Sequence, residues 1–77
     1  MYYTIKAQIY AGEESGFIAE CFELPVVTQG ETLDEVVQNL REAISLHLEG
    51  ENLTQLGFAP SPPIVINYEM PSVLCQN

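Results

Sequence analysis

The stretch TQGETLDEVVQNLREAI, residues 28–44, decides the fold because it joins a turn to a clearly marked helix. Thr32 and Glu35 are spaced as a capping box, in which the Thr32 hydroxyl accepts a hydrogen bond from the Glu35 amide. The same motif predicts that the Glu35 carboxylate accepts in return from the Thr32 amide. Gly30 is predicted to form the preceding turn with a positive φ, which a β-branched residue tolerates poorly.

A helix is predicted after Thr32, because apolar residues recur there at steps of three and four. The buried stripe of this helix consists of Leu33, Val36, Val37, Leu40, Ile44 and Leu48, with His47 beside the last. The outward face consists of Asp34, Gln38, Arg41, Ser45 and Glu49. Gly50 follows and is placed to end the helix.

The chain before the turn alternates between apolar and polar residues, which predicts β-strands. Residues 2–11 are expected to form a first strand. The residues on one face of this strand are Tyr3, Ile5, Ala7 and Ile9. The segment 12–16, GEESG, places two acids and a serine between glycines, so a hairpin loop is predicted there.

Residues 17–24 are predicted to return antiparallel as a second strand that is apolar on both faces. One face carries Phe17, Ala19 and Cys21, and the other carries Ile18, Phe22 and Leu24. Pro25 is expected to end this strand, because proline cannot donate to a central ladder. Residues 26–29, VVTQ, are predicted to form a third strand, which completes an antiparallel three-stranded meander.

The chain after the helix is predicted to contain a loop and one more strand. Gly57 and three prolines punctuate the loop. In the segment 64–70, IVINYEM, one face carries Ile64, Ile66, Tyr68 and Met70. The order β-β-β-α-β predicts an α+β fold in which one helix covers one face of the sheet. Because the second strand is apolar on both faces, we expect the uncovered face to meet another chain.

Length limits the protein to one domain. The chain has 77 residues, and we expect a domain at residues 1–71, a short tail at 72–77 and no C-terminal DNA-binding domain. A domain of this size buries only roughly 60% of its unfolded surface, so self-association as a dimer or tetramer is expected. The N-terminus lacks a secretory signal and no apolar run is long enough to cross a bilayer, which predicts a cytoplasmic protein without membrane contact.

The charge of the chain is strongly acidic. Eleven Asp and Glu residues oppose Lys6 and Arg41 alone, which gives a formal net charge of −9. A field of this sign repels phosphate, so direct nucleic-acid binding is not expected, whereas a basic protein would be attracted. Solubility is the alternative explanation of the acidity.

The sequence predicts no catalytic, metal-binding or cofactor-binding group. His47 is the one histidine, and Cys21 and Cys75 lie far apart, so neither a Cys–His nucleophile nor a metal-ligand spacing is formed. The cysteines are interpreted as reduced thiols, with a bond between them left open. Glu20 and Glu23 are expected on opposite faces of their strand, which disfavours a paired-carboxylate site.

The stretch GFIAECFELPVVTQGETLDEVVQNLREAISLHL, residues 16–48, resembles the HicB antitoxin family. The matching positions are Gly16, Glu20, Glu23, Leu24, Pro25, Thr28, Gln29, Gly30, Thr32, Glu35, Asn39, Glu42, Ala43 and Ile44. The resemblance implies a degenerate ribonuclease-H-like domain of order β-β-β-α-β. Its structural motif residues here are Gly16, Pro25, Thr28, Gly30, Thr32 and Glu35. The segment LPVVTQG is one residue shorter than the usual LPGCVTQG of the family, so the bend after Pro25 is expected to differ.

The resemblance implies an antitoxin of a type II toxin–antitoxin system. Such a protein neutralises HicA, a small basic toxin that cleaves messenger RNA, and an acidic domain can occupy a surface built for phosphate. The residues expected to contact this partner, chosen by exposure, are Glu13, Glu14, Asp34, Glu42 and Glu49. One alternative is a stand-alone HicB-like structural or small-ligand-binding module. Another is residual nuclease activity through Glu20, Glu23 and a third acid, although the first predicted strand offers no acid to hold a metal.

Overall fold

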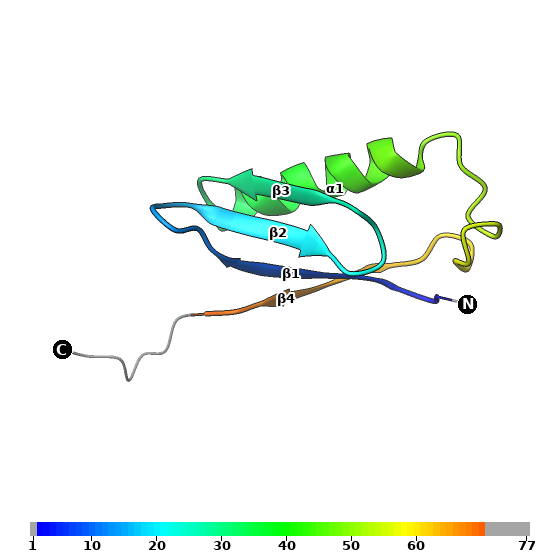
Figure 1. The fold of residues 1–77 in the computed structure, drawn as a ribbon, viewed down its shortest axis with the longest axis horizontal. Helices are drawn as coiled ribbons and strands as arrows, with labels where there is room; N and C mark the ends of the chain where they lie inside the picture. The colour runs from blue at the N-terminus through cyan, green and yellow to red at the C-terminus, as the bar shows by residue number, and fades with distance from the viewer. Residues whose placement is uncertain (1, 71–77) are drawn as a thin grey trace.

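The computed structural model describes residues 2–70 as one sheet with a helix along one of its faces (Figure 1). Its elements are β1 (Ile5–Ala11), β2 (Phe17–Cys21), β3 (Val27–Gly30), α1 (Leu33–Leu48) and β4 (Ile64–Tyr68). The strand order is β3-β2-β1-β4. β1, β2 and β3 are antiparallel neighbours, and β4 pairs parallel with β1. The predicted α+β class, element order and meander are therefore confirmed.

The core lies between the sheet and α1. Ile5, Ala7 and Ile9 of β1 are almost fully buried, as their alternation predicted. Register places Ala19 of β2 beside Ile9, so both strands send apolar side chains to the helix side. The sequence-based prediction was wrong about Tyr3, whose side chain is 70% exposed. The strand begins at Ile5, and residues 3–4 bend before it, so the alternation does not extend back to Tyr3.

The second strand is shorter than its sequence pattern indicates. β2 ends at Cys21, whose amide donates to the Val26 carbonyl at 3.0 Å, and residues 22–24 bend. The reversal therefore begins before Pro25. Leu24 was expected opposite Cys21, yet it is 7% exposed and belongs to the core. Beyond the end of a strand, alternation no longer decides which way a side chain points.

The predicted capping motif is confirmed in part. Thr32 is the N-cap of α1, and its hydroxyl accepts from the Glu35 amide at 3.0 Å. The Glu35 carboxylate accepts from the amide of Glu31, one residue earlier than the Thr32 amide that the sequence predicted. At the other end, Gly50 follows the C-cap with a φ of +78° and ends the helix as predicted.

The apolar stripe of α1 is buried along most of its length. Val36, Leu40 and Ile44 are buried, and Val37 and Leu48 pack partly against them. Leu33 was predicted to belong to the buried stripe, but it is 37% exposed. The end of β3 lies against Val36, in the next turn of the helix, so the first turn extends past the strand.

Gly30 is required for a different reason from the one predicted. It is the last residue of β3, and the glycines with positive φ are Gly16, Gly50 and Gly57. A Cβ atom on Gly30 would lie 2.6 Å from the Val36 amide nitrogen and 2.8 Å from its Cα. The absence of a side chain therefore lets the backbone of α1 approach the end of β3.

The helix covers only part of the sheet. α1 packs against β3 and β2, whereas the described residues show no comparable contact between α1 and β4. The loop after the helix supplies Phe58, which is 2% exposed and packs its ring 5.3 Å from that of Tyr2. The outer strand β4 is thus left with a half-covered face, as its position away from α1 in Figure 1 shows.

Candidate functional site

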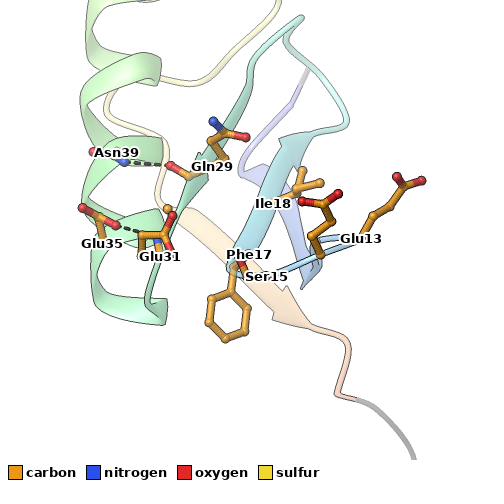
Figure 2. A pocket seen from close by; sticks show the side chains of 11 residues that line it. Glu13, Ser15, Phe17, Ile18, Gln29, Glu31, Glu35 and Asn39 are labelled. Atoms are coloured by element: carbon orange, nitrogen blue, oxygen red, sulfur yellow. Dashed lines mark hydrogen bonds between the residues drawn. The ribbon is translucent and has the colours of Figure 1, made fainter.

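A groove with a volume of about 510 Å³ lies where the loop between β1 and β2 approaches the start of α1 (Figure 2). Its lining residues are Gly12, Glu13, Glu14, Ser15, Phe17, Ile18, Gln29, Gly30, Glu31, Glu35 and Asn39. We call this feature the acidic groove, after its four glutamates. Two of these glutamates come from the hairpin loop and two from the turn and first residues of the helix.

Strand register brings the two sides of the acidic groove together. Phe17 pairs with Gly30, so the hairpin loop lies beside the end of β3. The loop is closed by a hydrogen bond of 3.0 Å from the Gly12 amide to the Gly16 carbonyl. Gly16 has a φ of +74°, and a Cβ atom there would lie 2.7 Å from the Gly30 carbonyl oxygen. Both its conformation and its surroundings therefore require glycine.

The electrostatic character of the groove is one-sided. Within the described residues its lining contains no Lys, Arg or His. Figure 2 shows Glu31 and Glu35 on the helix side and Glu13 on the hairpin side. The Glu35 carboxylate accepts a hydrogen bond from the amide of Glu31, which holds it at the edge of the hollow. The groove can therefore receive cationic side chains, which would form charge-assisted hydrogen bonds with its carboxylates.

The structure divides the five residues predicted to contact a partner into two groups. Glu13 and Glu14 line the acidic groove, and sequence reasoning missed that Glu31 and Glu35 join them. The predicted pairing of the second and third strands was the signal that could have placed the hairpin tip beside Glu31. Asp34 and Glu42 are exposed on α1, Glu49 is exposed at its C-cap, and none of the three lines the groove.

The uncovered face of the sheet is mixed in character. Val27 is 66% exposed there, and Val65 lies beside Lys6 on the same face. Polar side chains alternate with these across the strands. A hydrogen bond to the Glu20 carboxylate, with smaller contributions from burial and from its charge, raises the pKa of the Tyr10 hydroxyl on this face. The face therefore offers small apolar contacts within a polar surround.

The remaining reactive groups are dispersed. Glu20 interacts with Tyr10, whereas the Glu23 carboxylate accepts from the Lys6 amide at 2.8 Å, so the two carboxylates have separate partners. Burial, and then the charge of Glu23, raise the pKa of the Cys21 thiol. Cys75 lies outside the described residues. His47 is exposed near the end of α1.

Among residues 2–70, no three His, Cys, Asp or Glu side chains are grouped so that they could hold a metal ion. In the same range, no helix combines the length and apolar character needed to cross a bilayer. No protein-family model, no curated protein and no solved structure matches the chain.

Proposed function

We propose that this chain is a HicB-like antitoxin domain that binds and inhibits a small basic HicA-like toxin, which cleaves messenger RNA. The resemblance of residues 16–48 to the HicB family supports this proposal. So does the observed order β-β-β-α-β, since a degenerate ribonuclease-H-like domain of that family has the same order. In this proposal the domain acts as a binding protein.

The acidic groove is the observation that carries the proposal. Four carboxylates from two segments line one hollow, and no basic side chain within the described residues neutralises them there. A protein that binds RNA presents Arg and Lys side chains to phosphate oxygens. Carboxylates that line one groove can take the place of phosphate, so the same basic side chains would be occupied and RNA would be excluded.

The net charge of −9 contributes to the rate of encounter as well as to the bound state. Opposite net charges accelerate association, and salt weakens this attraction. The proposed complex should therefore form quickly at low ionic strength and weaken as salt is added. Shape and hydrogen bonds in the groove then provide specificity for one basic partner over others.

The test begins with the tagged protein in lysate of its own host, from which a small basic partner is captured and then purified separately. The partner alone must cleave messenger RNA, and the addition of this chain must stop the cleavage. Titration of the cleavage assay gives the inhibition constant. A partner that shows no ribonuclease activity, or cleavage that continues at saturating concentrations of this chain, would contradict the proposal.

Two matched double variants locate the contact. Glu13→Lys with Glu14→Lys reverses charge in the acidic groove, and Glu51→Lys with Glu69→Lys reverses the same number of exposed charges outside it. Both variants change the net charge equally. If only the groove variant loses inhibition, the groove is supported as the contact. A general effect of net charge would weaken inhibition by both variants to a similar extent.

A further inference from the structure

The two edges of the sheet differ in how their outward backbone groups are protected. At the β3 edge, the Asn39 side chain donates to the Gln29 carbonyl at 2.8 Å, and α1 packs along the strand. At the β4 edge, the described residues provide no comparable cover. Exposed edges of this kind pair readily with another strand unless charges, prolines or bulges prevent it.

The direction of the free backbone groups of β4 follows from its pairing with β1. The Ile5 amide donates to the Pro63 carbonyl at 2.9 Å, and the Glu69 amide donates to the Ile9 carbonyl at 2.8 Å. In a parallel ladder alternate residues of one strand bond to the same neighbour. Val65 and Asn67 therefore bond inward to β1, and the N–H and C=O groups of Ile64, Ile66 and Tyr68 point outward.

The side chains of these outward-bonding residues are also incompletely covered. Ile64, Ile66 and Tyr68 lie in register with the buried residues of β1, so they share the helix side of the sheet. Ile64 and Ile66 pack against the core but are only half-buried, and Tyr68 is 37% exposed. Another apolar strand beside β4 would cover this row.

The distribution of charge along the chain indicates which molecule would supply a strand beside β4. The stretch from Phe58 to Tyr68 contains no charged residue, although the whole chain carries a net charge of −9. A basic partner would be drawn to the acidic surface and would gain no attraction at this edge. A second copy of the chain is repelled elsewhere by its own acidity, and this edge is where two copies meet with little local repulsion.

We propose that two copies of the chain associate through antiparallel pairing of their β4 strands about a twofold axis at Ile66. In this register Ile66 faces its counterpart, and Ile64 faces Tyr68 of the other copy. All three residues are hydrogen-bonded positions in an antiparallel ladder, so each of their outward N–H and C=O groups gains a partner. The two sheets become one continuous sheet. No residue of β4 lines the acidic groove, so the groove of each copy stays open to a partner.

This inference does not depend on toxin binding, and salt separates the two interactions. Screening of the repulsion between two acidic chains strengthens the dimer, whereas it weakens a complex with a basic protein. Sedimentation equilibrium of the isolated full chain at low and high salt is therefore expected to show a dimer whose dissociation constant falls as salt is added. A chain that stays monomeric at every concentration and salt overturns the inference.

Two double variants test the register. Val65→Glu with Asn67→Glu sets like charges directly opposite one another across the proposed contact, because position 65 faces position 67 of the other copy. Val27→Glu with Gln29→Glu is the matched control, since these residues are exposed at alternate positions on the same face of the other edge strand. The β4 variant is expected to sediment as a monomer and the β3 variant as a dimer. Equal masses for the two variants would overturn the assignment.

Amide hydrogen exchange provides a readout without substitution. The amides of Ile64, Ile66 and Tyr68 are expected to exchange more slowly as protein concentration rises, because the second copy accepts their hydrogen bonds. The amides of Val65 and Asn67, already bonded to β1, are the internal controls. Exchange of the three outward amides that is independent of concentration would contradict pairing at this edge even if the protein forms a dimer.

Discussion

The two edge strands of this sheet are held in different ways. β3 lies against α1, and it is connected to the helix by a short turn and by the hydrogen bond from Asn39 to the Gln29 carbonyl. β4 is far from β1 in sequence, pairs with no other strand among the described residues, and has a half-covered face. Local contacts therefore stabilise one edge, while the other depends on a long-range pairing that leaves hydrogen-bonding groups free. Substitutions on the two sides of the sheet should expose this difference.

The largest expected difference in the free energy of unfolding is between substitutions in the core under α1 and substitutions in β4. Leu40 is fully buried on the sheet-facing side of α1, and Leu40→Ala should lower the free energy of unfolding by about 3 kcal/mol through lost transfer energy and a cavity. Ile66 of β4 is only half-buried, so Ile66→Ala should cost about 1 kcal/mol. Urea denaturation at one low protein concentration measures both, since dimerisation would add a concentration-dependent contribution. Equal losses would show that β4 is as well packed as the helix.

The close approach of β3 to α1 predicts the next effect. Gly30→Ala places a Cβ atom against the Val36 backbone and should destabilise by about 2 kcal/mol. Gly50→Ala is the matched comparison, because Gly50 has a positive φ but its added Cβ would meet no heavy atom within 4 Å. Backbone strain alone should then cost about 1 kcal/mol. A smaller loss at Gly30 than at Gly50 would mean that the helix moves away from the strand at little cost.

The same contrast explains which parts of the fold could be predicted from sequence. The bounds of α1, the Thr32 cap and the hairpin loop follow from local patterns, and the structure has them. The errors concern residues whose surroundings depend on distant parts of the chain. Tyr3 and Leu24 lie outside the strands that their alternation suggested. Gly30 is needed because of where α1 packs, and a turn signal in the sequence does not contain that information.

The acidic groove was only partly predicted, because its two sides come from segments that are distant in sequence. Exposure singled out Glu13 and Glu14 in the hairpin loop, and both line the groove. Their convergence with Glu31 and Glu35 depends on the register between Phe17 and Gly30, which composition and periodicity do not specify. Asp34, Glu42 and Glu49 do not line the groove, although sequence placed all five in one group.

The helix cap should have an intermediate effect. Thr32→Ala removes the acceptor for the Glu35 amide and should lower the free energy of unfolding by about 1 kcal/mol. Thr54→Ala is a suitable control, because Thr54 is exposed in the loop after α1 and its backbone amide, rather than its hydroxyl, bonds to Asn52. The difference between the two variants in urea denaturation isolates the cap. Equal free energies of unfolding for the two variants would mean that the Thr32 cap does not stabilise the helix.

The smallest effect concerns Cys21, at the end of β2 on the helix side of the sheet. Burial raises the pKa of its thiol, and the Glu23 carboxylate raises it further, because both disfavour the thiolate. In a Cys75→Ser variant, which leaves one thiol, alkylation by iodoacetamide should be slow at pH 8 and should accelerate only at higher pH than for the urea-unfolded chain. Glu23→Gln should shift the midpoint of this pH profile down by less than unfolding does, since burial is the larger cause. A midpoint at or below that of the unfolded chain would show that the end of β2 opens to solvent, and the helix-covered half of the sheet would then be less firmly packed than its contacts indicate.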